Sequence, residues 1–195
     1  QFQASTVEKE GQALMDKCGF HSKGIFVMDG SKRSGHGNAY FTGFGSNKRI
    51  VFFDTLLESL EPQEIEAVLA HELGHFRLKH IQKRLLSTML LSFAALALLG
   101  WLAGEPWFYN GLGVSQASSG MALLLFMLVL PVFTIFLQPL LSRLSRKHEF
   151  EADAYAVQQS SGADLIKALV KMYRENASTL TPDPLYSAFH DSHPP

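Results

Sequence analysis

Cysteine is almost missing from this sequence of 195 residues, since Cys18 is the only one. A single thiol can form neither an internal disulfide nor a cysteine-rich metal site. Histidine, which occurs eight times, is therefore the natural ligand if the protein binds a metal. The formal net charge of -1 reflects no excess of basic residues, so the composition gives no indication of a nucleic-acid partner.

Charge is missing from one long stretch of the chain. Residues 85–142 contain no lysine or arginine and one acid, Glu105. Within this stretch, residues 85–103 and 121–141 are apolar runs that approach the ~20 residues needed to cross a ~30 Å hydrocarbon core. We predict a hairpin of two transmembrane helices. The alternative, a hairpin buried in a soluble core, is disfavoured because so long a stretch without basic residues is rare in globular chains.

The flanks of the predicted hairpin indicate its orientation. Trp101, Trp107 and Tyr109 near the end of the first run are residues that membrane interfaces favour, whereas Pro131 and Pro139 should kink the second helix. Both ends of a hairpin return to one side, which the positive-inside rule makes cytoplasmic. We expect a multi-pass protein of a bacterial inner membrane or the endoplasmic reticulum. The basic flanks are Arg77, Lys79, Lys83 and Arg84 on one side and Arg143, Arg146 and Lys147 on the other.

The remaining segments predict helices and a small β-sheet. Helices are expected where apolar residues recur at helical spacing, and strands where Ile, Val and Phe cluster between turn residues. The segment NAYFTGF (38–44) could add a third strand, and the tail is expected to be a loop. The expected helices cover 2–17, 145–160 and 164–176, the other strands cover 24–30 and 49–54, and the tail covers 179–195.

A further helix is expected to begin at Pro62. Proline suits the first turn of a helix, and acids such as Glu61 and Glu64 there face the positive end of the helix dipole. Apolar residues continue at helical spacing as far as Phe76. The segment HELGH, residues 71–75, therefore lies on this helix, which should have about five turns.

The two histidines of HELGH are spaced as metal ligands. His71 and His75 are one helical turn apart, so their imidazoles can occupy adjacent corners of a zinc tetrahedron. Glu72 points about 100° round the helix, where its carboxylate can take a proton from water beside the metal. A catalytic zinc ion needs a third protein ligand and one open position.

A second helix offers the third ligand. The metzincin pattern does not apply, because its later Gly and His positions are occupied by Leu78 and Ile81, and His80 misses by one residue. The run EFEAD, residues 149–153, places two acids on one helical face, so Glu149 could bind the metal while Asp153 holds a ligating histidine or helps to transfer protons. The hairpin should bring the two helices together.

The same helical geometry applies to the neighbouring residues. Glu151 is a rival ligand, but it lies off the face that Asp153 occupies. The small residues Ala152, Ala154 and Ala156 would let the second helix pack closely on the first. We expect His80 and His148 to contact lipid headgroups or solvent.

In combination, HELGH, the two apolar runs and SRKHEFEADAYA (145–156) resemble the integral-membrane zinc metalloproteases of the CAAX prenyl protease type. The segments NAYFTGFG, FFDTLLE and YSAFHDSHPP extend the similarity from about residue 20 to the end. The HtpX-type membrane proteases share the two metal motifs but are associated less with the S-H-P-P tail.

The resemblance implies one zinc ion on His71, His75 and Glu149, with Glu72 as the base, and Asp153 matches the supporting Asp of the family. It also implies that Asn38 and His193 lie near the scissile bond and steady the oxyanion, with His190 as a weaker candidate. Donors at such positions can each contribute roughly 3 kcal/mol to catalysis. A strand at NAYFTGF could align an extended substrate along its edge.

The expected fold is a mainly α membrane protein. A single zincin-like metalloprotease domain, residues 1–195, would have a small β-sheet and the helical hairpin inserted between its two metal-binding helices. Because the resembling family has seven membrane helices, we expect this chain to be a fragment of a longer one.

The expected activity is zinc-dependent endopeptidase hydrolysis of a peptide or protein substrate, with C-terminal prenylation of that substrate implied only by the family. One alternative is a broad-specificity quality-control protease of the HtpX type. The other is a membrane scaffold whose zinc joins two helices without catalysis. That alternative is disfavoured because structural zinc sites usually fill all four positions with Cys or His.

Overall fold

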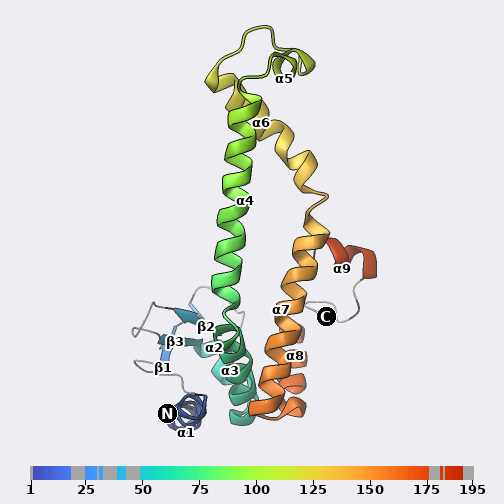
Figure 1. Cartoon of the computed structure of the whole chain (residues 1–195). Coiled ribbons are helices and arrows are strands. Elements are labelled where there is room, and N and C mark those ends of the chain that lie inside the picture. The colour runs from blue at the N-terminus through green and yellow to red at the C-terminus, as the bar shows by residue number, and fades with distance from the viewer. Residues whose placement is uncertain are drawn as a thin grey trace. The chain divides into compact units, whose positions relative to one another are not determined.

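The computed structural model describes residues 2–18, 25–29, 31–32, 39–42, 49–175, 181 and 183–190. Over these residues the chain is mainly helical with one small sheet, as predicted (Figure 1). The chain divides into two compact units. Unit 1 comprises the described residues up to Leu78 and those of Arg146–Asp183, and unit 2 those of Lys79–Ser145 and from Pro184 onward.

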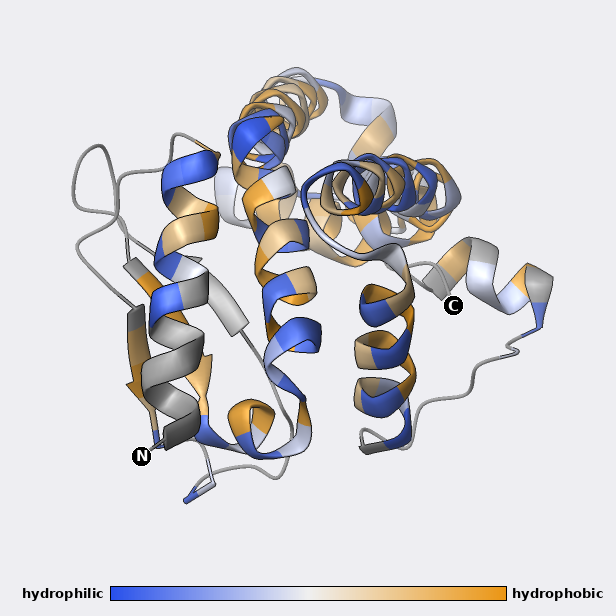
Figure 2. Ribbon diagram, turned by 90° about the horizontal axis from the view of Figure 1, so that it is seen from below, coloured by the Kyte–Doolittle hydropathy of each residue, from blue (hydrophilic) through white to orange (hydrophobic). Residues whose placement is uncertain are grey.

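The sheet of unit 1 has three strands, in agreement with the prediction that counted NAYFTGF. They are β1 (Ile25–Met28), β2 (Ala39–Thr42) and β3 (Arg49–Phe53), in the order β1-β3-β2. β3 runs parallel to β1 and antiparallel to β2, with Ala39 opposite Phe52. Figure 2 shows β1 and most of β3 in the hydrophobic colour. The order places β2 at an edge of the described sheet.

The core of unit 1 lies between the sheet and three helices. α1 (Phe2–Lys17) and α8 (Gly162–Glu175) both contact α3 (Pro62–Arg77). Each large apolar side chain that is fully buried here contributes about 1.5–3 kcal/mol. The largest such side chains are Met15, Ile50, Phe52, Leu56, Leu60, Ile65, Leu69 and Leu73. The helix that carries HELGH is thus fixed on several sides.

The start of α3 agrees with its prediction. Pro62 is its first residue, and Glu61 and Glu64 form a reciprocal capping box in which the Glu61 N–H donates to Glu64 Oε2 at 2.8 Å. Glu64 Oε2 also accepts from Lys171 Nζ of α8 at 2.7 Å. Burial by itself raises the pKa of Glu64, but these two hydrogen bonds, together with the charges of Lys171 and Lys167, outweigh it, so the pKa lies below its ordinary value.

The end of α3 was not predicted. The helix stops at Arg77, and two residues later Lys79 adopts the left-handed conformation with φ 58°. Left-handed backbone is costly for a residue with a Cβ atom, because that atom approaches the following carbonyl oxygen. The turn at Lys79 separates α3 from α4 (His80–Leu102).

Unit 2 contains the helix expected for the first membrane span. α4 is 23 residues long, has a mean hydropathy of 2.0 over its most apolar window, and buries none of that window in the structure. A core helix of a soluble domain would be buried. α4 is therefore long and apolar enough to cross a membrane, and it begins five residues before the predicted position.

The second predicted span is not one continuous helix. Residues 121–141 are divided between α6 (Ser119–Thr134) and α7 (Gln138–Gln159), which are bent by 61° at the break. Pro131 has no N–H for the helical ladder, and Pro139 stands in the first turn of α7. The expected kink is therefore present, as a bend at a break between two helices. The described residues therefore hold one candidate span, or two if the bent pair counts as one.

Three short helices were missed. α2 (Asp54–Ser59) follows β3 directly, α5 (Pro106–Gly111) lies in the predicted linker, and α9 (Pro184–His190) lies in the predicted loop-like tail. Two of them begin with proline, which is pre-organised for the first helical position. The predicted helix 145–160 is the second half of the longer α7, and the predicted helix 164–176 corresponds to α8.

Candidate metal centre

The two histidines of HELGH lie side by side on α3. Their ring centroids are 4.9 Å apart, and their Nε2 atoms are separated by 3.1 Å. The preceding turns of α3 are buried from Ala67 to Ala70, while both histidines remain partly exposed, with 15% and 18% of their side chains accessible. A metal ion held by these rings could therefore still be reached from outside.

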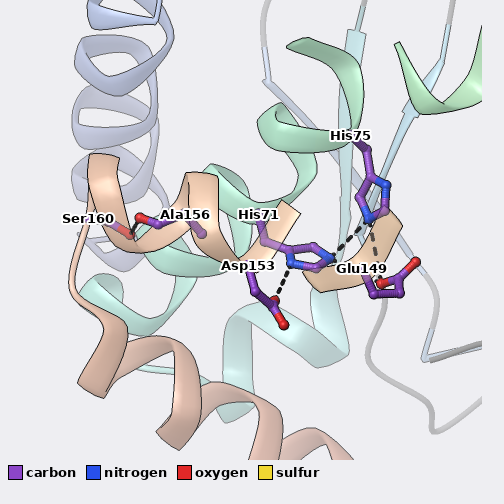
Figure 3. Close-up of polar contacts among 6 residues, drawn as sticks. All are labelled: His71, His75, Glu149, Asp153, Ala156 and Ser160. Atoms are coloured by element: carbon purple, nitrogen blue, oxygen red, sulfur yellow. Dashed lines mark hydrogen bonds and ion pairs between the residues drawn. The ribbon is translucent and has the colours of Figure 1, made fainter. Parts of the chain in front are cut away.

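The acids of α7 meet these histidines, as the hairpin argument predicted. Glu149 Oε2 lies 3.5 Å from His71 Nε2 and 3.5 Å from His75 Nε2. Figure 3 shows the two histidines projecting from α3 and the two acids, Glu149 and Asp153, from α7. All four residues belong to unit 1. Two nitrogen atoms and one carboxylate oxygen thus converge on one point.

The spacing of these three atoms suits a small metal cation. Zinc bonds of 2.0–2.2 Å to nitrogen and oxygen in a tetrahedron require ligand atoms roughly 3.3–3.5 Å apart. The three observed separations are 3.1, 3.5 and 3.5 Å. His71, His75 and Glu149 also form a metal-compatible group by proximity alone. Small shifts of the two rings would accommodate an ion.

Asp153 fixes the orientation of His71. The Nδ1–H of His71 donates to Asp153 Oδ1 at 2.8 Å, since an ionised carboxylate can only accept. This leaves Nε2 of His71 facing Glu149 and His75. Burial by itself lowers the pKa of His71, but the hydrogen bonds to Asp153 and Glu149 and the charge of Glu72 outweigh it and raise the pKa to about 9. The site therefore stabilises positive charge where a metal cation would sit.

The two site-bearing helices approach closely at a glycine that sequence reasoning overlooked. A Cβ atom added to Gly74 would lie 3.0 Å from the Cα of Ala152, 3.1 Å from the Ala152 carbonyl oxygen and 3.2 Å from the Cβ of Tyr155. Ala152 and Ala156 are fully buried, as expected, but Ala154 is exposed and takes no part in the packing. A glycine inside an otherwise regular helix was the available signal.

Among the described residues, the other candidate site residues are not members of the group formed by His71, His75 and Glu149. Glu72 is half-buried on α3, and its charge contributes to the raised pKa of His71. Glu151 forms an ion pair of 3.8 Å with Lys147. His190 is the last residue of α9. Asn38 and His193 lie outside the described residues.

His80 and His148, which were expected to contact lipid headgroups or solvent, differ in how much of their surface is exposed. His148 is half-buried. His80 retains only 3% of its accessible surface, so the expectation that it contacts headgroups or solvent was wrong. A helical periodicity assigns a residue to one face of its helix, but it does not show what covers that face in the folded chain.

Comparison with known proteins gives one consistent result. The family model "Peptidase family M48" matches residues 1–195. The chain is 39% identical to CAAX prenyl protease 1 of Saccharomyces cerevisiae, covering 96% of this chain and 45% of that protein. It is 33% identical to the Homo sapiens homologue of that protease, covering 97% and 48%. The chain therefore spans about half the length of these relatives.

A solved structure agrees with the sequence matches. The crystal structure of S. mikatae Ste24p superposes with a TM-score of 0.86 at 39% identity, over 96% of this chain and 47% of that one. The chain belongs to peptidase family M48, a family of metalloproteases.

Proposed function

We propose that this chain carries the catalytic centre of a membrane-embedded zinc metalloendopeptidase of the CAAX prenyl protease type. The observation that supports this most directly is the convergence of His71 Nε2, His75 Nε2 and Glu149 Oε2 within 3.5 Å of one another. The names of the relatives support the reaction class. Because the chain spans about half of those relatives, the activity belongs to the whole protein.

The donor set favours zinc among the common metal ions. Two imidazole nitrogens and one carboxylate oxygen suit zinc, whereas magnesium and calcium prefer oxygen ligands alone. Three protein ligands leave a fourth position open, which is the pattern of catalytic zinc sites. A zinc ion bound there would supply Lewis-acid chemistry, polarising the scissile carbonyl and lowering the pKa of water.

Glu72 is the proposed general base. It directly follows His71 on α3 and is half-buried, and its charge acts on His71 although it is not one of the converging group. In this role Glu72 accepts a proton from the attacking water and delivers it to the leaving amine. Asp153 is a positioning residue, because it acts through the Nδ1–H of His71.

Substrate contacts are proposed from two sources. β2 lies at the edge of the described sheet, and it contacts α3. An extended peptide could pair with the outer edge of β2, which would align its scissile carbonyl near the ligands. Asn38 and His193 are proposed, from the family resemblance, to donate hydrogen bonds to the oxyanion.

The membrane arrangement is also part of the proposal. We infer that α4 and the bent pair α6 and α7 form a hairpin inserted between the two metal-binding segments of one metalloprotease domain. Basic residues flank this hairpin at Lys79, Lys83 and Arg84 and again at Arg143, so the metal site would face the cytoplasm. Further spans would make the whole protein multi-pass.

Two other functions are less consistent with these observations. Broad quality-control proteolysis of the HtpX type would use the same chemistry, but the curated relatives carry the CAAX prenyl protease name. A zinc-joined scaffold would be expected to present a fourth ligand. Among the described residues the metal-compatible group at His71 contains three.

The test is cleavage of a C-terminal CAAX peptide, with and without its prenyl group, by the longest form of the protein that contains this chain. Zinc content is measured on the same samples. Glu72→Gln should retain zinc and lose most activity, whereas His71→Ala should lose the metal. Cleavage by the Glu72→Gln variant would refute the proposed base.

Glu149→Gln and Glu151→Gln form a matched pair for the third ligand. Both remove one negative charge from the same turn of α7, but only Glu149 lies within 3.5 Å of both histidines. We expect Glu149→Gln to lose zinc and Glu151→Gln to keep it.

In the peptide assay, equal cleavage of prenylated and unprenylated peptides would favour the broad-specificity alternative.

A further inference from the structure

The chain has two tryptophans, and the structure places them together. Trp101 is in the last turn of α4 and Trp107 is in α5, with ring centroids 6.0 Å apart and planes inclined by 59°. More than half of each residue is exposed, 57% for Trp101 and 56% for Trp107. Two large amphipathic rings thus form one exposed patch, which we call the tryptophan pair.

A small core beneath holds the tryptophan pair in place. Phe108 and Tyr109 of α5 are buried against Leu102 of α4 and against α6. The Tyr109 hydroxyl donates to the Ala103 carbonyl oxygen at 2.9 Å, which ties α5 to the end of α4. The indole N–H of Trp107 donates to Glu105 Oε2 at 3.0 Å. These contacts hold α5, and with it Trp107, against the end of α4.

The surroundings of the tryptophan pair change from apolar to polar along the chain. Before it, α4 exposes large apolar side chains such as Phe93, Leu96 and Leu98. After it, residues 115–119 read Ser-Gln-Ala-Ser-Ser and are exposed. Indole combines an apolar body with one polar N–H, so tryptophan is enriched where hydrocarbon meets lipid headgroups.

We propose that the tryptophan pair is an interfacial anchor, with both rings at the boundary between the acyl chains and the headgroups of a phospholipid bilayer. This rests on the proposed membrane insertion of α4. The 23 residues of α4 are about 34 Å long, close to the ~30 Å hydrocarbon core, and Trp101 is one residue from its end. The anchor fixes how far α4 can slide along the membrane normal.

Fluorescence quenching by brominated lipids tests the depth of the rings directly. The chain is reconstituted in phosphatidylcholine vesicles that carry bromine either near the headgroup or near the end of an acyl chain. The unmodified chain is measured first, because all its tryptophan emission comes from this patch. Trp101→Phe and Trp107→Phe then leave one ring each. We expect shallow bromine to quench more strongly than deep bromine in every case.

A deep control separates this inference from the membrane proposal. Phe93→Trp, placed in a chain with both native tryptophans changed to Phe, moves the fluorophore eight residues back along α4, about 12 Å deeper. Its emission should be quenched more strongly by deep bromine. Suppose that deep bromine quenches the Phe93→Trp control as expected. If Trp101 and Trp107 are then quenched by neither lipid, or more strongly by deep bromine, the interfacial anchor is refuted and the membrane span of α4 stands. If the control is also unaffected, α4 does not insert, and both proposals fail.

Discussion

Gly74 of α3 and Ala152 of α7 are so close that a Cβ atom on the glycine would lie 3.0 Å from the Cα of the alanine. Gly74 immediately precedes His75, and Ala152 immediately precedes Asp153. The contact therefore determines how near the two halves of the metal centre can approach. A wider separation would pull Glu149 away from the two imidazoles.

Gly74→Ala should therefore damage both packing and metal binding. The contacted atoms include backbone, which cannot move aside, so we expect a loss of about 1–3 kcal/mol of stability from overpacking and a lower zinc content. The thermal midpoint in detergent and the bound zinc measure the two effects. Gly100→Ala in α4 is the matched control, because nothing lies within 4 Å of its added Cβ. Equal thermal midpoints and equal zinc contents in the two variants would contradict the steric argument.

Asp153→Asn should weaken metal binding without removing a ligand. The amide can no longer offer a charged acceptor to the Nδ1–H of His71, so we expect zinc affinity to fall by about 10–100-fold. Competition with a chelator of known affinity measures the change. Asp164→Asn makes the same chemical change in the Asp164–Lys167 pair of α8 and should leave zinc affinity unaltered.

The Glu64–Lys171 pair should make stability depend on pH. The folded pKa of Glu64 is below its unfolded value of 4.5, so its stabilisation is present above pH 4.5 and is lost as pH falls through the folded pKa. At neutral pH we expect Glu64→Gln to cost about 1–3 kcal/mol, toward the lower end because Lys171 is 39% exposed.

Urea unfolding of the wild type and Glu64→Gln from pH 7 down to pH 3 checks this sign. The difference between the two proteins should shrink as the solution becomes acidic. Lys167→Met breaks an exposed pair on the same helix and removes only the weakest of the effects that lower the pKa of Glu64, so it should change stability less than Glu64→Gln does. If the difference in unfolding free energy instead grew as the pH fell, it would contradict the lowered pKa of Glu64.

Substitution by glycine should change the stability of the protein in opposite directions at Lys79 and at Lys83. Lys79 has φ 58°, where glycine is tolerated without steric cost, so Lys79→Gly should be neutral or stabilise by up to about 1 kcal/mol. Lys83 lies in the helical turns of α4, where glycine should destabilise by about 1 kcal/mol. The thermal midpoints of the two variants in detergent measure this contrast.

The metal centre could be anticipated because its signals are local. The spacing of His71 and His75 depends only on helix geometry, and the capping residues before Pro62 predict where that helix begins. The pairing with Glu149 needed one further idea, that the intervening apolar stretch folds back. The role of each ligand remains a prediction that the zinc measurements above would test.

The break in the second span, the short helices and the burial of His80 could not be predicted from hydrophobic patterns in the sequence. An apolar run reports composition, so the break between Thr134 and Gln138 was invisible except through the prolines beside it. α5 and α9 are each only one or two turns long, too short for periodicity to appear, and both lie in segments rich in turn residues. The burial of His80 depends on tertiary packing, which its position at the start of α4 does not reveal.

The order of the chain also decides when the metal-compatible group can form. His71 and His75 leave the ribosome more than 70 residues before Glu149, with α4, α5 and α6 between them. A metal held by all three would close this long loop as a cross-link does, at a cost in chain entropy that grows only slowly with loop length. Synthesis of the protein thus contains its own delay: the three ligand atoms cannot converge until the intervening helices have been made.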